Sequence, residues 1–209
     1  MYPDSIQKLI DLFIRFPGIG PRQAARFAFF VLKEKNPFIP ELVAALQEME
    51  ARIGICAECF RTMERAAGDG SRCSFCRDTK RDHAFIAVME KESDMSNMEK
   101  TGAYHGLYHV LGGVISPLDT DSPKQLRLKE LYERVEHTAK EHASCEVILA
   151  TNPTTEGDTT ALYIERILSP LKDAHPGLTL SRLGRGLSLG AEVEYADEVT
   201  LQNALKNRK

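Results

Sequence analysis

Residues 145–164 read CEVILATNPTTEGDTTALYI, and this stretch contains the pattern that decides the fold. An apolar run at 145–150 is followed by a polar loop and then by helical spacing over 159–171. A short apolar run bounded by turn residues is typical of a buried strand. A strand followed by a loop and a helix is half of a β-α-β unit, and such units build parallel sheets.

The same alternation extends along much of the chain. Residues 125–142 have helical spacing, with Leu128, Leu131 and Val135 on one face. Three further apolar runs predict strands: residues 85–89, 108–111 and 178–183. We therefore expect a parallel-sheet α/β domain over residues 80–183.

The rest of the 209-residue chain divides into three smaller modules. Residues 1–53 are helical in pattern, residues 54–79 contain two cysteine pairs around the polar loop AAGDGS, and residues 184–209 form a glycine-rich loop with a short terminal helix or arm. The predicted fold class is thus a multi-module α/β protein. No apolar stretch is long enough to span a membrane and no signal peptide precedes the first helix, so we expect a cytoplasmic protein.

The net charge of −3 is unevenly distributed. Residues 1–35 contain six Lys and Arg against three acids, whereas residues 83–209 contain fourteen against nineteen. The total therefore does not exclude a nucleic-acid partner for the N-terminal module.

A glycine turn between two helical segments is the first candidate site. In FPGIGP, residues 16–21, Gly18 and Gly20 allow the backbone to approach a ligand closely, and Pro21 suits the first turn of a helix. Arg22 and Arg26 are four residues apart and share one face beside that helix start, where phosphate is favoured. The pattern resembles the helix-hairpin-helix motif of DNA repair proteins. The alternative is a plain turn between two helices.

The cysteine pairs are the second candidate site. Cys56, Cys59, Cys73 and Cys76 form two C-x-x-C knuckles, a pattern typical of one tetrahedral zinc ion. A four-thiolate shell leaves no open coordination position, which indicates a structural site. An iron–sulfur cluster and a redox pair are the alternatives. The fifth cysteine, Cys145, is expected in the core.

The third candidate site is a group of polar residues expected at one sheet edge. Glu90 follows one strand and Asp94 lies four residues later, while Asn152, Thr154, Glu156 and Asp158 are expected in the loop after another strand. Carboxylates clustered at the carboxyl ends of parallel strands can hold Mg²⁺ for phosphoryl transfer.

This arrangement resembles the Toprim domain of topoisomerases and primases. Glu90 matches the glutamate of that family, but Asn152 and Thr154 stand where the type IA topoisomerase loop has two aspartates. Neutral oxygens bind Mg²⁺ more weakly, so the departure favours a docking or vestigial surface over catalysis. A magnesium-dependent nuclease or topoisomerase is the alternative.

Taken in order, the modules resemble one family, the bacterial RecR recombination mediators. Besides the hairpin, the cysteines and the Toprim-like loop, the matching strings are ISPLD at 115–119 and RLGRGLSLGAEVEYADEVTL at 182–201. Asp158 stands where that family often has glutamate.

The resemblance implies a non-enzymatic, ring-forming DNA clamp, a dimer or tetramer that binds single- and double-stranded DNA without sequence preference. It also implies that RecO, and in many bacteria RecF, act with it to load RecA. Arg22 and Arg26 are implied as DNA contacts, and Glu90 and Asp94 as groups that dock RecO.

Overall fold

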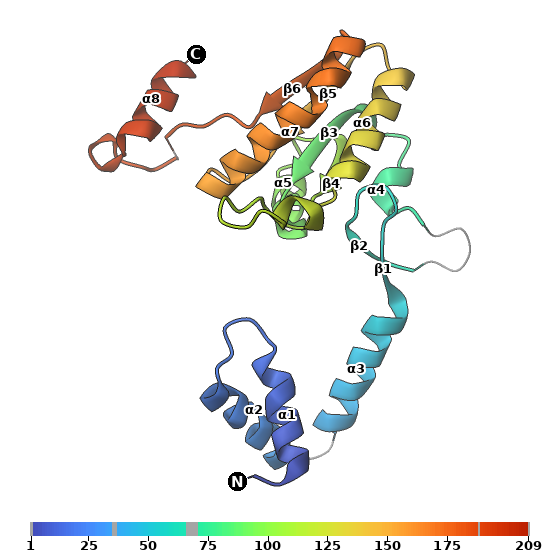
Figure 1. Ribbon diagram of the computed structural model, residues 1–209, viewed down its shortest axis with the longest axis vertical. Coiled ribbons are helices and arrows are strands. Elements are labelled where there is room, and N and C mark those ends of the chain that lie inside the picture. The colour runs from blue at the N-terminus through green and yellow to red at the C-terminus, as the bar shows by residue number, and fades with distance from the viewer. Residues whose placement is uncertain (1, 35–36, 66–70, 188, 209) are drawn as a thin grey trace. The chain divides into compact units, whose positions relative to one another are not determined.

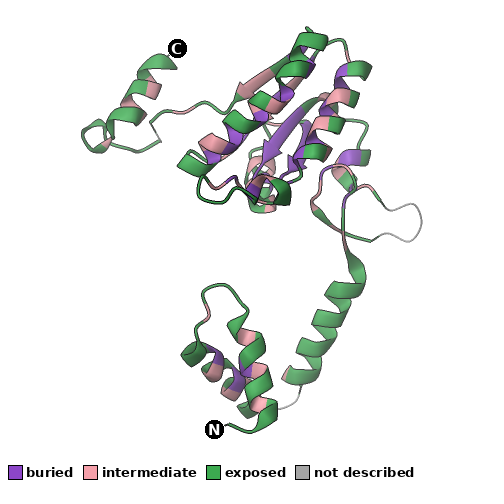
Figure 2. Ribbon diagram, in the orientation of Figure 1, coloured by how far each residue is buried: buried purple, intermediate pink, exposed green. Residues whose placement is uncertain are grey.

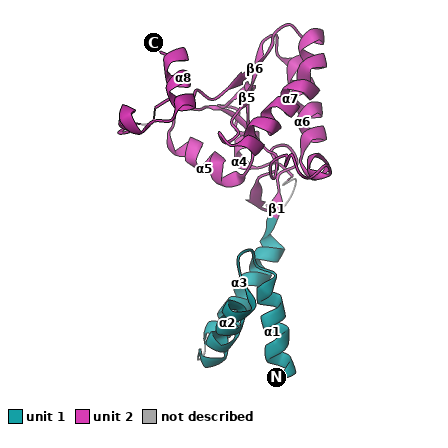
Figure 3. Cartoon of the chain, turned by 60° about the vertical axis from the view of Figure 1, so that its left-hand side comes forward, with its two compact units in different colours: residues 1–53 teal, residues 54–209 magenta. Residues whose placement is uncertain are grey.

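The computed structural model describes residues 2–34, 37–65, 71–187 and 189–208 (Figure 1). The chain forms two compact units, Met1–Ile53 and Gly54–Lys209 (Figure 3). Most of the loop AAGDGS, residues 66–70, lies outside the described residues. None of the helices in the described ranges is long and apolar enough to cross a membrane.

The first unit contains three helices: α1 (Asp4–Ile14), α2 (Pro21–Lys33) and α3 (Phe38–Arg52). The first two pack through a small core of Ile10, Ala24 and Ala28. Pro21 occupies the first turn of α2, as predicted. Proline has no backbone N–H, and N–H groups in the first turn of a helix have no partner within the helix, so nothing is lost there. In contrast, α3 has no buried residue.

The second unit is built on a four-stranded sheet of β3 (Asp82–Met89), β4 (Gly106–Val110), β5 (Cys145–Leu149) and β6 (Leu178–Arg182). The strand order is β4-β3-β5-β6 and every pair is parallel, which confirms the predicted parallel-sheet α/β fold. Val88 lies opposite Leu149, so β3 and β5 end side by side. The residues that directly follow β3 and β5 therefore lie close together at the carboxyl edge of the sheet.

Helices cover both faces of this sheet, and its centre is buried (Figure 2). On one face, α6 (Leu128–Glu141) and α7 (Thr155–Ala174) pack against the strands through residues such as Leu131 and Ile164. On the other face, α5 (Glu92–Lys100) places Met95 against Ala87 and Tyr108. The predicted face of α6 is buried as expected, and Cys145 lies in the core at the start of β5.

The cysteine module precedes the sheet. It contains the two-stranded pair β1 (Ile53–Ile55) and β2 (Thr62–Glu64) and the single-turn helix α4 (Ser74–Arg77). The backbone N–H of Val110 in β4 donates to the carbonyl of Cys59 at 2.8 Å, so the module is attached directly to an edge strand.

After β6 the chain continues through the 3-10 turn η2 (Val193–Tyr195) to α8 (Glu198–Lys206). The Asp197 side chain caps α8 by accepting from the Thr200 N–H, which confirms the predicted short terminal helix. Asn207 Nδ2 donates to the carbonyl of Arg185 and so ties the arm back to the glycine-rich loop.

Two sequence predictions about elements were incomplete. The helix expected from residue 159 begins at Thr155, because Thr154 caps it by accepting from the Gly157 N–H. Glu156 and Asp158 therefore lie in the first helical turn, where acidic side chains are favoured, and not in the preceding loop. Sequence reasoning also missed α5, whose pattern has too few apolar residues to show a clear period.

Candidate functional site

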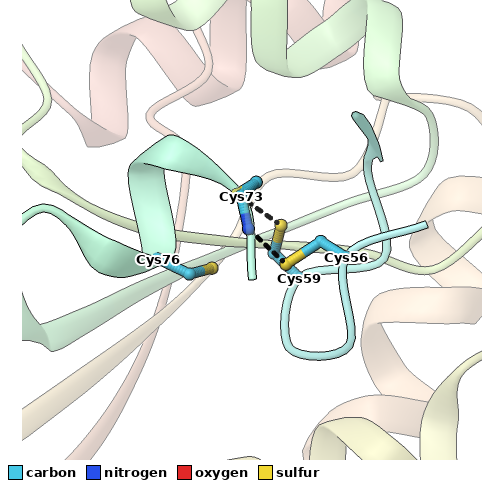
Figure 4. A group of neighbouring side chains, drawn as sticks. All are labelled: Cys56, Cys59, Cys73 and Cys76. Carbon is cyan, nitrogen blue, oxygen red and sulfur yellow. Dashed lines mark hydrogen bonds between the residues drawn. The ribbon is translucent and has the colours of Figure 1, made fainter. Parts of the chain in front are cut away.

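The four cysteines converge on one point in the structure (Figure 4). Their sulfurs all lie within 4.8 Å of one another, and Cys59 Sγ is 3.5 Å from Cys73 Sγ. In a tetrahedral thiolate site with metal–sulfur bonds of about 2.3 Å, neighbouring sulfurs are about 3.8 Å apart. All four cysteines are buried and none is in a disulfide. The residues therefore fit a metal ion.

Electrostatics at the cluster also favour a cation. Hydrogen bonds from Cys59, Cys73 and Cys76 lower the pKa of the Cys56 thiol, whereas hydrogen bonds with Cys56 and its other neighbours raise the pKa of Cys76. The four sulfurs consequently cannot all ionise by themselves. A bound divalent ion removes this conflict because it stabilises every thiolate at once.

Arg134 of α6 joins the cysteine module to the α/β domain. Its guanidinium donates to the carbonyls of Glu58 at 3.0 Å and Tyr108 at 2.5 Å, and it lies 3.9 Å from Cys76 Sγ. Sequence reasoning missed this residue, since nothing in its local pattern distinguishes it from a solvated helix position. The arrangement places the positive charge of Arg134 next to the four cysteine sulfurs.

Two arginines near the cysteines have partners within the protein. Arg72 forms an ion pair with Glu58 at 2.6 Å and donates to the carbonyl of Cys76. Arg61 lies over the ring of Phe75 and 3.5 Å from Glu92. Both side chains therefore hold the module together.

Glu90 and Asn152 meet at the carboxyl edge of the sheet, as their places after β3 and β5 predict. Glu90 is buried, and its two carboxylate oxygens accept from Asn152: one from the backbone N–H at 2.7 Å and the other from Nδ2 at 2.5 Å. Gly157 packs so closely here that a Cβ at this position would collide with both residues. Both carboxylate oxygens of Glu90 therefore have hydrogen-bond donors within the protein.

The other carboxylates predicted at this edge do not converge with Glu90. Asp158 is paired with Arg185 and lies 3.5 Å from Arg182, and the Arg185 hydrogen bond holds the pKa of Asp158 below its usual range. Glu156 is exposed and Asp94 is half-buried on α5. Over the described parts of the chain, only the four cysteines form a group whose ligand atoms are close enough to share a metal ion.

The hairpin residues lie at the junction of α1 and α2. Gly18 has a φ of +77°, a backbone conformation that favours glycine, and Gly20 directly precedes α2. Arg22 and Arg26 are exposed on the first turns of α2. Pro21 has no N–H, and the N–H groups of Gln23 and Ala24 donate to the Gly20 carbonyl. The Arg22 N–H and the two guanidiniums are therefore the donors that the start of α2 offers.

Comparison with known proteins agrees with this architecture. Residues 6–49 match the RecR helix-hairpin-helix model, residues 84–183 the Toprim domain model and residues 186–209 the RecR C-terminal model. The chain is 42% identical over 208 residues to the recombination protein RecR of Cutibacterium acnes, covering 100% of this chain and 96% of that protein. The chain belongs to the RecR family.

Membership of the RecR family makes this a protein of recombination and DNA repair, and the resemblance found in the sequence is confirmed. The Toprim match covers the sheet whose edge contains Glu90 and Asn152.

Proposed function

We propose that this chain is a non-enzymatic recombination mediator that binds DNA without sequence preference. The observation that carries the non-enzymatic part is the occupied sheet edge, where Glu90 is bound by Asn152 and Asp158 by Arg185. A magnesium site for phosphoryl transfer needs carboxylates that face the ion, and here they face other side chains.

DNA binding is assigned to the hairpin of the first unit. Backbone N–H groups at Gly18, Gly20 and the start of α2, with Arg22 and Arg26 beside them, suit phosphate oxygens, which are the same in every sequence. Such contacts release counterions, so the affinity should fall steeply as salt rises.

The cysteine site is assigned to one structural zinc ion. Four buried thiolates fill a tetrahedral shell, and a filled shell supplies no open position for chemistry. Metal analysis of freshly purified protein should find about one zinc per chain. Folded protein without metal, or a visible absorption band typical of an iron–sulfur cluster, would contradict this assignment.

The mediator is proposed to act in the cytoplasm as a ring-shaped oligomer, a dimer or tetramer, together with RecO and RecF in loading RecA. The exposed apolar face of α3 supports self-association, because such faces are normally covered. Glu90 is buried, so a role in docking RecO is proposed for the more accessible residues of the group, the exposed Asn152 and Glu156 and the half-buried Asp94.

The DNA-binding proposal is tested by retention of labelled circular DNA by wild-type protein and by Arg22→Ala/Arg26→Ala. We expect retention to fall strongly in the double variant and to fall with salt in the wild type, while the melting temperature is unchanged because both side chains are exposed. Lys8→Ala/Arg52→Ala removes the same charge elsewhere in the unit and is the matched control. Unchanged retention in the hairpin variant would refute the assignment.

The same preparation tests the alternative of a working Toprim enzyme. Supercoiled plasmid is incubated with the protein and Mg²⁺ or Mn²⁺. We expect no nicking or relaxation; turnover that Glu90→Ala abolishes would overturn the non-enzymatic proposal.

A further inference from the structure

An open hollow on α2 combines positive charge with aromatic rings. Arg22, Arg26 and Lys33 line it together with Tyr2, Phe29 and Phe30. Arg22 and Lys33 are eleven positions apart on the helix, about 16 Å at 1.5 Å per residue. The hollow therefore continues away from the glycine turn along the helix.

The rings in this hollow lie outside the small core of Ile10, Ala24 and Ala28. Phe30 packs edge-to-face on Phe38 of α3, with ring centroids 5.8 Å apart, and is still 51% exposed. Tyr2 is 46% exposed. Tyr2 packs edge-to-face on Phe29 with ring centroids 5.3 Å apart, an arrangement that holds its ring in place. The hollow therefore presents positioned and partly uncovered aromatic surface.

The cations of the hollow are also available. Within the described part of the chain, Arg22, Arg26 and Lys33 form no ion pair, and none of the residues that line the hollow is acidic. A partner for this surface must consequently carry negative charge and flat apolar groups at the same time.

We infer that this face of α2 binds single-stranded DNA, with unpaired bases stacked on Tyr2 and Phe30 and phosphates at the three cations. The inference rests on the proposed DNA binding at the hairpin, and it adds that this face prefers single-stranded to duplex DNA. Aromatic rings stack on a base only when it is free of its duplex neighbours, and a basic groove with rings is the usual surface for single strands. A second copy of the chain is the poorer occupant, since a twofold contact through this face would bring like charges together.

The first experiment measures binding of a fluorescent oligo-dT and of a duplex by anisotropy. Tyr2→Leu/Phe30→Leu keeps an apolar side chain at both positions but removes the stacking surface, so its affinity for the single strand should fall at least about fivefold. Its salt slope and its affinity for the duplex should be unchanged, because the phosphate contacts remain. Arg22→Ala/Arg26→Ala should instead weaken both ligands and reduce the salt slope.

The matched control is Tyr195→Leu, which removes an exposed ring from the C-terminal arm and should bind like the wild type. Melting temperature and mass in solution are recorded for every variant. If Tyr2→Leu/Phe30→Leu binds the single strand like the wild type, or lowers the oligomer mass, the inference is overturned while the proposed function stands. If the wild type binds neither ligand, the proposed function itself fails.

A second reporter does not depend on loss of affinity. The chain contains no tryptophan, so Phe30→Trp introduces one fluorescent indole into the hollow. Stacking on bases should quench its emission when oligo-dT is added, and the duplex should leave it nearly unchanged. Equal quenching by both, or by neither while DNA is bound, would contradict stacking at this position.

Discussion

At the scale of single residues, the pair Glu90 and Asn152 decides the chemistry of the sheet edge. A carboxylate buried in an apolar sheet is costly unless its oxygens accept hydrogen bonds, and here one residue supplies two donors. An aspartate at position 152, as in catalytic relatives of the Toprim domain, would replace the side-chain donor with a second negative charge. The neutral amide of Asn152 thus binds the glutamate in the place that a metal cation would take in a magnesium site.

Exchanging the two side chains tests this pairing. Asn152→Asp should lower the free energy of unfolding by about 1–3 kcal/mol, because it removes a donor from the buried Glu90 and places a second carboxylate beside it. Glu90→Gln should cost less, because the exposed Asn152 amide can turn and accept from the new amide. In the double variant, the new amide at position 90 can donate to the new carboxylate at position 152, while its oxygen still accepts from the backbone N–H. We expect part of the stability to return in urea unfolding; strictly additive losses would show that the two residues do not interact.

His109 of β4 is a second residue whose surroundings predict a measurable property. It is fully buried, Nε2 lies 3.0 Å from the carbonyl of Arg127, and burial together with the charge of Arg134 lowers its pKa to about 3. The unfolded chain takes up this proton near pH 6.5, so it binds more protons than the folded chain between the two values.

Stability should therefore fall as pH falls below about 6.5, and this histidine should account for about 2 kcal/mol between pH 7.5 and pH 5. His109→Gln retains a donor for the Arg127 carbonyl but does not titrate. Its free energy of unfolding should be less at pH 7.5 than that of the wild type and should depend less on pH. An unchanged pH dependence would show that other groups control acid unfolding.

At the scale of elements, α6 connects the cysteine module to the sheet. Its inner face packs on the core through Leu131 and Val135, and Arg134 reaches from it to carbonyls of the cysteine module and of β4. Because the same guanidinium lies beside Cys76 Sγ, one side chain both attaches the module and contacts the proposed metal site. Such outer contacts orient the ligands and offset their charge.

Arg134→Gln should release metal faster than the wild type, because the positive charge beside the thiolates is lost. Zinc transfer to a coloured chelator measures this rate directly, and we expect an increase of about 10-fold or more. Lys129→Gln removes a positive charge from an exposed position of the same helix and should leave the rate unchanged. Equal rates for all three proteins would show that Arg134 does not act on the metal centre.

At the scale of the whole molecule, the first unit leaves a helix face uncovered. On α3, apolar residues recur at helical spacing and are all exposed: Ile39, Leu42, Val43, Leu46 and Met49. A contiguous apolar stripe of this kind marks an interaction surface, since water is a poor environment for it. Self-association through this stripe is consistent with the proposed ring.

Leu46→Glu should lower the mass of the protein in solution, because it places a charge in the middle of the stripe. Light scattering coupled to size exclusion gives the mass without reference to shape. Gln47→Glu introduces the same charge at the neighbouring position and should retain the wild-type mass. If both variants keep that mass, another surface forms the oligomer.

The sequence by itself determined the elements and the chemistry that depends on local spacing. The run CEVILATNPTTEGDTTALYI predicted a strand and a helix, and two C-x-x-C knuckles predicted a metal-binding group, because periodicity and short spacings directly control which side chains share a face or a turn. The family resemblance rested on the same local strings and is confirmed.

Only the tertiary structure decided which distant side chains meet. Glu90 and Asn152 are 62 residues apart, Arg134 and Cys76 are 58 apart, and Asp158 was expected to be available for a metal until Arg185 was found beside it. These partnerships depend on the order of strands in the sheet and on the packing of α6 and the C-terminal loop. Local sequence patterns do not predict such packing, because a long charged residue occupies the same position in a helical or strand pattern whether its side chain faces water or a distant partner.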